Sequence, residues 1–426
     1  CAMHMNTTMS ANPTFNNNET FAGPIKSQGY KLGYFGKYLN VNVDTSLLCG
    51  EKNSQGEQQW QIPRHWDRWL MMCKPSYVDQ VWNDNGKHRF TGTQPGNYTT
   101  SIIGNATLEW LTSLDVNDPF LAVVAPHAPH LPSTPAAWYS NAFGPHGLKA
   151  PRIMGWNASG LDNHHWTISM QPALDDVDVV QIDSEYTKRQ QSLLSVDDIV
   201  KALHETLSSD GRWDNTFVIF TSDHGYSLGQ LRVPSHKTMV YDGNTRVPLL
   251  LKGPGIHKET CINEVTSHSD IAATLIEWAG GSVPASMDGR SFASLFSGAA
   301  AGSSSTNITA VASRQATIIE YWSIHVPVRL ERGHATDSAN NTHRALRVLN
   351  DTHNLLFAEF TSDDTDYNFQ HISYRELFNV ATDPTFLNNL CRKETQPACH
   401  VKNGTGIDVA ALLATLHDSY ACRGRL

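Results

Sequence analysis

The stretch "TFVIFTSDHGYSLGQ", residues 216 to 230, is the part of the sequence that decides the fold. It begins as a run of apolar and β-branched residues, a pattern typical of a strand buried in the middle of a parallel sheet. It then ends in Asp223, His224 and Gly225. Because ligands of open α/β sheets bind at the carboxyl ends of the strands, these residues indicate a functional site at the tip of this strand.

The segments around this stretch alternate between helix and strand patterns. Residues 183–209 repeat apolar positions at about the helical period and predict a long helix. Residues 245–255 predict a second buried strand, and residues 269–281 predict a helix with Ser269 as its N-cap and Gly280 at its end. This succession predicts an α/β fold with a mostly parallel central sheet and helices on both faces.

The region upstream contributes further elements. Residues 23–40 predict a helix end, a turn at Gly29 and a short strand. Residues 99–115 have helical spacing, and the strand "DPFLAVVAP" follows from residue 118. Residues 50–98 are rich in tryptophan and turn signals, and we expect irregular structure there. Residues 1–20 are rich in Asn and Thr and predict a loop.

The C-terminal part has a different pattern. Residues 298–309 are small and polar and predict a linker or a surface loop. Beyond it, residues 344–363 predict an antiparallel hairpin and residues 406–420 a terminal helix. We therefore expect an α/β domain over residues 1–305 and a smaller C-terminal antiparallel-sheet subdomain with a terminal helix over residues 306–426.

Composition excludes several classes of function. The chain has 426 residues, of which 40% are hydrophobic and 9% aromatic, so it can bury a substantial core. A net charge of -9 and a pI near 6.1 argue against a nucleic-acid partner or an anionic membrane surface. No apolar run approaches the roughly 20 residues that a membrane-spanning helix needs.

Glycosylation signals and cysteines point to the secretory pathway. A single Asn-X-Ser/Thr tripeptide is weak evidence, but nine in one chain favour N-glycans. These sequons begin at Asn6, Asn18, Asn97, Asn105, Asn157, Asn307, Asn340, Asn350 and Asn403. Of the seven cysteines, Cys391 and Cys399 are close enough to close a short loop. Cys1 is the expected unpaired thiol, and a start without Met or signal peptide suggests a missing N-terminus.

Cationic and metal-binding side chains follow several of the predicted strands. Asp223 and His224 are residue types that bind a divalent cation. Two histidines in "APHAPHLP", residues 125–132, are held between prolines that make a loop rigid. Lys37 in "GKYLN" and Lys237 in "SHKTM" are compact point charges suited to an anion.

Each of these signals has a plainer alternative. Asp223 and His224 also fit a capping Asp and a hydrogen-bonded His in a turn. The histidines fit a Pro-rich surface turn, and each lysine fits an ordinary surface position. Together, however, Lys37, His130, Asp223/His224 and Lys237 would form the cationic shell that a sulfate or phosphate group requires.

Seven pieces of the sequence resemble one known family. They are "GYKLGYFGKYLN", "PFLAVVAPHAPHLP", "RQQSLLSVDDIVKAL", "FTSDHGYSLGQ", "TRVPLLLKGPGI", "MDGRSF" and "ELFNVATDP". In this order they resemble the sulfatases of the alkaline-phosphatase-like superfamily, and within them the secreted glucosamine-6-sulfatase-like branch. The resemblance runs from about residue 23 to the C-terminus and implies the alkaline-phosphatase-like fold.

The resemblance also implies a role for each candidate residue. Asp223 and His224 would be two ligands of a single Ca2+, with His224 where many relatives have Asn. Lys37 would touch the sulfate and the nucleophile, and His130 would lie at the leaving-group oxygen. Lys237 would bind a sulfate oxygen and share in protonating the leaving alcohol. His127 and His236 are left without a role.

The chain departs from the family pattern in three places. Leu39 stands where many sulfatases have a His two residues after the lysine. The paired Asp near the N-terminus is absent, and so is the Cys-X-Pro-Ser-Arg segment whose cysteine becomes formylglycine. Cys1 is followed by "AMHMN", so it is not assigned as the nucleophile. We therefore expect an N-terminally truncated chain that is inactive alone.

The resemblance implies a sulfuric ester hydrolase located outside the cell or in the lysosome or vacuole. Its substrate would be a sulfated sugar of the N-acetylglucosamine-6-sulfate kind or an aryl sulfate. Two alternatives stay open. One is a secreted protein that binds sulfated glycans without turnover, and the other is a phosphate or phosphonate ester hydrolase of the same superfamily.

Overall fold

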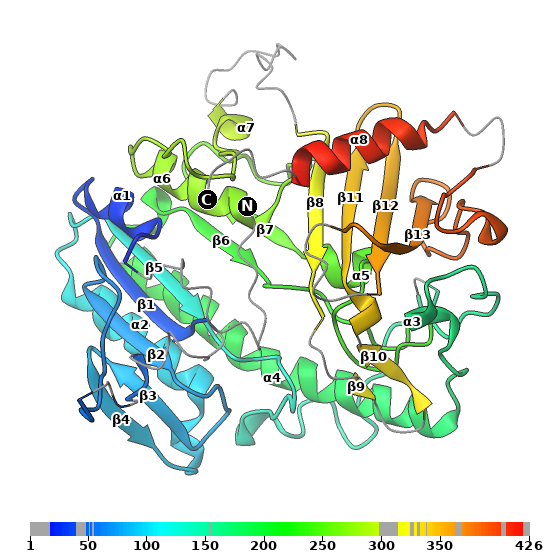
Figure 1. Ribbon diagram of the computed structural model, residues 1–426. Coiled ribbons are helices and arrows are strands. Elements are labelled where there is room, and N and C mark those ends of the chain that lie inside the picture. The colour runs from blue at the N-terminus through cyan, green and yellow to red at the C-terminus, as the bar shows by residue number, and fades with distance from the viewer. Residues whose placement is uncertain are drawn as a thin grey trace.

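The computed structural model shows an α/β body and a C-terminal antiparallel sheet side by side (Figure 1). It describes residues 18–39, 48–50, 52, 55–153, 155–297, 314–323, 328–329, 333–337, 339–362, 369–401 and 406–420. The loop expected over residues 1–20 lies almost wholly outside these ranges. The linker expected at 298–309 and the domain boundary near residue 305 also lie outside them.

A five-stranded mixed sheet forms the first half of the α/β body. Its strand order is β4-β3-β2-β1-β5. The strands are β1 (Lys31–Lys37), β2 (Arg68–Met72), β3 (Gln80–Asp84), β4 (Lys87–Thr91) and β5 (Phe120–Ala125). β1 is parallel to both β2 and β5, whereas β3 and β4 extend the sheet as an antiparallel hairpin.

The expectation of irregular structure over residues 50–98 was wrong, because this segment contains β2, β3 and β4. Trp69 and Trp82 are fully buried in these strands. Asn85 and Gly86, both with positive φ, form the two-residue turn between β3 and β4. Asn-Gly is the residue pair that such a hairpin turn favours. These tryptophans therefore belong to the core. The turn residues Asn85 and Gly86 connect two strands and do not mark irregular structure.

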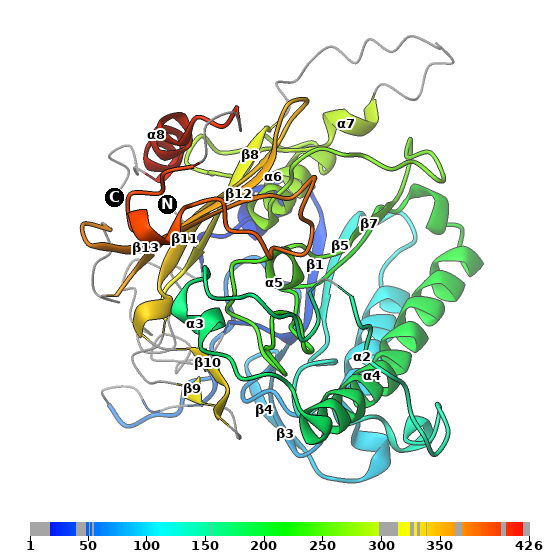
Figure 2. The ribbon, with the colours of Figure 1, turned by 90° about the vertical axis from the view of Figure 1, so that its right-hand side faces the viewer.

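Helices cover both faces of this sheet, as expected. On one face Phe35 packs against α2 (Thr99–Ser113) and the side of α4 (Asp176–Ser209) that carries Ile199. On the other face Leu32 packs against α1 (Ala22–Lys26) and α6 (His268–Trp278). Alternate residues of β1 thus point to opposite faces, as strand geometry requires. Figure 2 shows the long α4 beside α2 along one flank of the body.

The N-cap of α6 is Ser267. The sequence pattern predicted Ser269, and this prediction was wrong. Ser267 and Asp270 form a capping box in which each side chain bonds the backbone of the other residue. The two bonds of a capping box join residues three positions apart. Asp270 therefore pairs with Ser267, and Ser269 is too close to it in sequence to take this place. Gly280 follows the end of the helix with a φ of 82°, as expected.

β6 (Val218–Thr221) and β7 (Leu249–Lys252) pair with each other in antiparallel fashion. The opening stretch was expected to be a buried central strand of a parallel sheet, and this expectation was wrong for the described residues. Phe220 is 40% and Leu250 is 61% exposed. The chain reverses direction between the two strands, and an apolar run carries no information about strand direction. The segment between them carries Asp223, His224 and Lys237, three of the predicted site residues.

The C-terminal part is a four-stranded antiparallel sheet of order β13-β12-β11-β8, with a helix across one face (Figure 1). The strands are β8 (Ala316–Tyr321), β11 (His343–Leu349), β12 (Asn354–Thr361) and β13 (Ile372–Asn379), and the helix is α8 (Val409–Tyr420). The expected hairpin and terminal helix are thus confirmed. Leu416 of α8 packs with Leu346 and Leu355 of the sheet.

Two disulfides and several short elements complete the fold. The disulfide Cys391–Cys399 was expected, and Cys49–Cys73 was not. No helix within the described ranges is both long and apolar enough to cross a membrane. The short elements are η2 (Pro95–Asn97), η3 (Ala137–Tyr139), α3 (Trp166–Ser169), η4 (Trp213–Asn215), α5 (Asp242–Thr245), α7 (Ser294–Ser297), β9 (Val328–Arg329), β10 (Ala335–Asp337), η6 (Ala339–Asn341) and η7 (Lys393–Thr395).

Candidate functional site

Four segments bring the five predicted site residues into one charged cluster. The cluster consists of Lys37, His130, Asp223, His224 and Lys237. Lys237 Nζ lies 2.8 Å from His224 Nε2, and His224 Nε2 lies 3.3 Å from Asp223 Oδ2. Burial lowers the pKa of His130, His224 and Lys237, and the charge of Lys37 lowers each of them further. For Asp223 burial acts in the opposite direction, and the charge of Lys37 is one of those that lower its pKa.

Lys37 is the last residue of β1. The residue before it, Gly36, lies unusually close to β5. Gly36 faces Ala125 in the parallel register and has a φ of 120°. A Cβ at this position would lie 2.0 Å from the carbonyl oxygen of Ala125. Only glycine fits such a contact, and it places Lys37 beside the start of the histidine loop.

The histidine loop, residues 126–132, follows β5 and is held by two side chains from other elements. Tyr77 Oη donates to the carbonyl oxygen of His130 at 2.6 Å. Arg189 Nη1 of α4 donates to the carbonyl oxygen of Pro129 at 3.0 Å. These bonds fix the two peptide groups that flank His130.

The ring of His130 has a defined orientation. Its Nδ1 lies 2.7 Å from the carbonyl oxygen of Leu131, and since a carbonyl only accepts, Nδ1 carries the hydrogen. Nε2 then presents a lone pair. Burial lowers the pKa of His130, and the charges of Lys237 and Lys37 lower it further. The imidazole therefore favours its neutral form in this cluster.

His127, which the sequence left without a role, lies beside His130. The two ring centroids are 4.8 Å apart, and the ring of Tyr77 is 5.0 Å from that of His127. Burial lowers the pKa of His127 to about 4, helped by His130 and Lys37. Its Nδ1 is buried and has no hydrogen-bond partner within the described part of the chain.

Asp223 and His224 follow β6 in a turn that packs against the start of α5. A Cβ on Gly225 would lie 2.1 Å from the carbonyl oxygen of Gly243, so this contact requires glycine. The amide of Gly225 donates to the carbonyl oxygen of Asn244 at 2.8 Å. His224 Nδ1 donates to the carbonyl oxygen of Gly225 at 2.8 Å, which leaves Nε2 with a lone pair.

Asp223 is attracted to the lysines of the cluster, whereas the two lysines repel each other. Partial burial would raise the pKa of Asp223, but attraction to His224, Lys37 and Lys237 outweighs it and keeps the pKa below the ordinary value. Burial lowers the pKa of Lys237, and repulsion from Lys37 adds to this effect. The cluster thus pairs an ionised carboxylate with an ammonium that is a stronger acid than a free lysine.

The residues for a metal ion fit only in part. The carboxylate of Asp223 is a suitable donor, whereas the lone pair of His224 Nε2 accepts from the Lys237 ammonium at 2.8 Å and can bind a metal only after this ammonium moves away. Ca2+, moreover, takes about six to eight oxygen ligands. No cluster of three His, Cys, Asp or Glu side chains that could hold a metal occurs among the described residues. By themselves these two residues would supply only part of the ligand set of such an ion.

Sequence reasoning missed two supporting residues, Tyr77 and Arg189. Arg189 lies in "RQQSLLSVDD", a piece quoted for the family resemblance, and its guanidinium stacks on the ring of Tyr226 at 4.1 Å. It thus bridges the histidine loop and the turn after His224. Nothing in the local sequence reveals this, because the contact partners are 60 and 37 positions away along the chain.

Tyr77 ends the segment Cys73-Lys74-Pro75-Ser76-Tyr77, which differs from Cys-X-Pro-Ser-Arg only in its last residue. Cys73 is buried and bonded to Cys49. A cysteine in a buried disulfide is not free for modification, so Cys73 is not a hidden nucleophile.

The family model described as "Sulfatase" matches residues 2–282. A curated relative, the N-acetylglucosamine-6-sulfatase of Bos taurus, is 31% identical over 392 residues. The alignment covers 88% of this chain and 65% of the relative, so the chain spans about two thirds of that protein's length.

Two solved structures share the fold. One is described as a complex with its substrate D-glucosamine-2-N,6-O-disulfate, with a TM-score of 0.64 at 18% identity. The match covers 96% of this chain and 83% of that one. The other is a phosphonate monoester hydrolase of Agrobacterium radiobacter, with a TM-score of 0.63 at 16% identity, covering 97% and 84%. The expected alkaline-phosphatase-like architecture is thereby confirmed, and the fold alone does not separate the two reactions.

Proposed function

The chain belongs to the sulfatase family, and on this premise we propose that the full-length protein hydrolyses a sulfate ester of a sulfated sugar. The products are the free sugar hydroxyl and inorganic sulfate. The observation that carries the proposal is the convergence of Lys37, His130, Asp223, His224 and Lys237 from four segments into one cluster. A sulfate monoester is a tetrahedral anion, and this cluster offers it several cationic groups.

Lys37 and Lys237 bind the sulfate oxygens in this proposal. Each ammonium is a compact charge with three donors, which suits a tetrahedral anion. In this proposal His130 lies at the departing sugar oxygen, and Lys237 shares in protonating that oxygen. Because the pKa of Lys237 is lowered, its ammonium gives up a proton more readily than a free lysine does.

Asp223 and His224 supply part of a Ca2+ site in this proposal. A divalent cation there would offset the negative charge of the sulfate. The 426 residues contain no Cys-X-Pro-Ser-Arg segment, so they supply binding and proton transfer and not the attacking group. Formylglycine as the nucleophile follows from the family alone.

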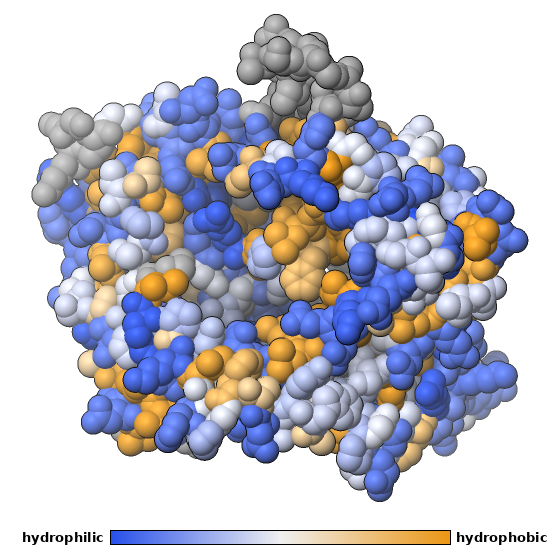
Figure 3. Space-filling view, turned by 180° about the vertical axis from the view of Figure 1, so that it is seen from behind, coloured by the Kyte–Doolittle hydropathy of each residue, from blue (hydrophilic) through white to orange (hydrophobic). Residues whose placement is uncertain are grey.

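The preferred substrate is a glucosamine sulfate or a related aminosugar sulfate. The name of the bovine relative and the substrate in the first solved structure support this choice. Figure 3 shows that the face opposite to that of Figure 1 is hollowed near its centre, with hydrophobic side chains along one edge.

Passage through the secretory pathway is part of the proposal. Two disulfides and nine sequons support it. Asn105 is exposed on α2 and is a suitable glycan acceptor. Asn157 is not, because its side chain bonds both the amide and the carbonyl of Leu174.

The test compares three substrates on the full-length protein: an aryl sulfate, the matching aryl phosphate and N-acetylglucosamine 6-sulfate. We expect release of sulfate from the sugar, slower turnover of the aryl sulfate and at least about 100-fold slower turnover of the phosphate. Preference for the phosphate would favour the phosphate or phosphonate ester hydrolase. Binding of sulfated sugar without turnover would favour the glycan-binding protein.

Replacing Arg189 with methionine should lower kcat/KM about 10- to 100-fold, since one charged hydrogen bond contributes about 1.5–3 kcal/mol. The substitution removes the bond to Pro129 and frees the histidine loop. Lys188→Met, at an exposed position on the same helix, is the matched control and should change little. Equal activity of the two variants would contradict a role for Arg189 in holding the loop.

A further inference from the structure

The backbone on both sides of Lys237 is strained. His236 has a φ of 151° and Thr238 a φ of 92°. Residues with a Cβ rarely adopt such angles, and for a β-branched residue such as Thr238 the conformation is a genuine outlier. Strain of this kind persists only where the surroundings hold the backbone in place, and it is common at functional sites.

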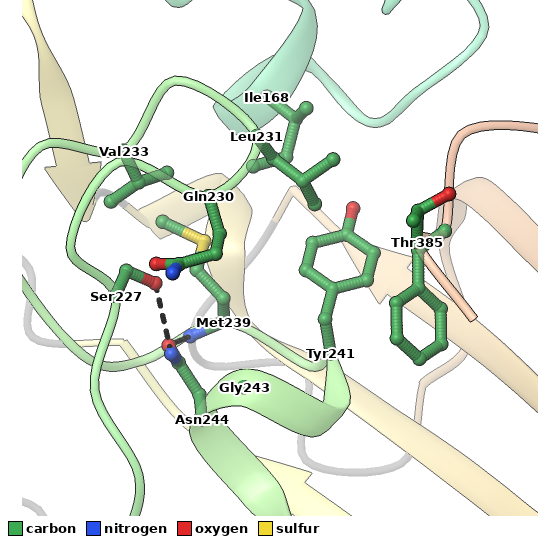
Figure 4. A pocket seen from close by; sticks show the side chains of 11 residues that line it. Ile168, Ser227, Gln230, Leu231, Val233, Met239, Tyr241, Gly243, Asn244 and Thr385 are labelled. Carbon is green, nitrogen blue, oxygen red and sulfur yellow. Dashed lines mark hydrogen bonds between the residues drawn. The ribbon is translucent and has the colours of Figure 1, made fainter. Parts of the chain in front are cut away.

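The N-terminal side of this segment is anchored within the α/β body. The amide of Ser227 donates to the carbonyl oxygen of His236 at 2.7 Å. On the other side, the amide of Met239 donates to Asn244 Oδ1 at 2.9 Å, and Asn244 Nδ2 donates to Ser227 Oγ at 2.9 Å. Figure 4 shows Ser227, Met239 and Asn244 together at one side of a small pocket. These bonds hold the two ends of the segment.

The carbonyl of Thr238 is held by the C-terminal subdomain. Asn341 Nδ2, at the end of η6, donates to the carbonyl oxygen of Thr238 at 3.1 Å and to Asp337 Oδ1 at 3.2 Å. The side chain of Asn341 is almost wholly buried, and Asp337 also accepts from Tyr321 Oη. The Asn341 amide nitrogen is thus held between two residues: Thr238, through its carbonyl oxygen and, at 3.5 Å, its hydroxyl oxygen, and Asp337, through its carboxylate.

Further bonds from the same subdomain reach the residues just after Thr238. Tyr241 Oη donates to the buried carboxylate of Glu376 on β13 at 2.9 Å. Arg347 of β11 pairs with Asp242 at 3.1 Å. The C-terminal subdomain thus contacts this stretch at Thr238, Tyr241 and Asp242, and the contact of Asn341 with Thr238 is the one adjacent to Lys237.

We infer that Asn341 is a positioning residue for Lys237, through which the C-terminal subdomain holds the strained Thr238 backbone and so sets the direction in which the lysine side chain enters the cluster. The inference rests on the proposed function, because it gives Lys237 a sulfate to bind. Without the Asn341 amide, Thr238 relaxes toward an ordinary φ and rotates the peptide that follows Lys237. The distance of 2.8 Å between Lys237 Nζ and His224 Nε2 then lengthens.

The first experiment compares Asn341→Ala with Asn389→Ala in the full-length protein. Asn389 is a matched control because it is also buried, and its side chain bonds Leu377, Cys391 and Arg375 within the C-terminal subdomain. We expect kcat/KM for the aryl sulfate to fall on the order of 10- to 100-fold for Asn341→Ala, since small misplacements of a reacting group cost this much. Asn389→Ala should lose melting temperature to a similar extent and activity by less than about twofold.

Two readouts do not depend on turnover. Amide hydrogen exchange of residues 236–240 should become faster in Asn341→Ala than in Asn389→Ala, while exchange in β11 and β12 changes equally in both. In the otherwise unchanged protein, Thr238→Gly should melt at a higher temperature than Thr238→Ala, because only glycine adopts a φ of 92° freely. Thr238→Gly should also reduce the loss of activity caused by Asn341→Ala.

The inference is overturned if Asn341→Ala and Asn389→Ala lose activity equally, or if Thr238→Ala is the more stable of its pair. If Asn341→Ala does not fold, the glycine and alanine pair at 238 still decides. Absence of sulfatase activity in the unsubstituted protein would instead refute the proposed function, and the exchange and melting experiments would still test the positioning.

Discussion

Replacing Asp223 with alanine should reduce sulfate release by about 10³-fold or more in the full-length protein and lower its calcium content. Asp223 lies beside His224 and within range of Lys37 and Lys237, so its loss removes the anionic member of the cluster. Without it, cationic groups repel one another where a cation should bind. Preorganised charges of this kind each contribute about 10²–10³-fold to turnover, and the loss of a metal adds to this.

The measurement is kcat/KM for an aryl sulfate together with the metal content of the purified protein. Asp197→Ala is the matched control, because this carboxylate is exposed on α4. We expect the control to retain both activity and metal. Unchanged turnover in Asp223→Ala would show that Asp223 is not part of the site. Loss of turnover with unchanged metal content would show that Asp223 acts through its charge and does not hold the metal.

Replacing Lys237 with methionine should lower kcat/KM about 10²–10³-fold and should not lower the melting temperature. Lys237 is half-buried, and burial and the charge of Lys37 lower its pKa. A lysine whose folded pKa lies below its unfolded pKa binds its proton less tightly in the folded protein. At neutral pH its charge therefore opposes folding, and this cost disappears only as the pH rises through the unfolded pKa. Methionine removes the charge and keeps most of the side-chain volume.

Activity and melting temperature should thus move in different directions for Lys237→Met. Lys201→Met is the control, since Lys201 is exposed on α4 and makes only a 3.9 Å ion pair with Glu205. It should change neither quantity appreciably. A Lys237→Met variant that melts lower and keeps its activity would show that the lysine stabilises the fold and does not take part in turnover.

Elements with strong local patterns were predictable from the sequence. The long helix α4 has its apolar side chains at helical spacing, and the structure adds the cap at Asp175, whose side chain accepts from the amides of residues 177 and 178. The hairpin of β11 and β12 and the terminal α8 were also expected. The sequence contains the capping box of α6, but the serine predicted as the N-cap, Ser269, is not the one that forms it.

The errors arose where local pattern and tertiary packing disagree. Tryptophans and turn residues in segment 50–98 suggested irregular chain, yet Trp69 and Trp82 lie in a sheet whose hairpin uses the Asn85-Gly86 turn. The apolar residues of β6 predict a central strand of a parallel sheet, whereas among the described residues β6 pairs with β7 and runs antiparallel to it. Apolar runs report burial preference and say nothing about the partner strand.

The sequence alone determines the types and loop positions of the candidate residues Lys37, His130, Asp223, His224 and Lys237. Only the tertiary structure decided how they are held. Tyr77 and Arg189 reach the histidine loop, and Asn341 reaches Thr238, across 53, 60 and 103 positions of chain respectively. A hydrogen bond depends on distance in space, and sequence spacing predicts that distance only within one helix, strand or turn.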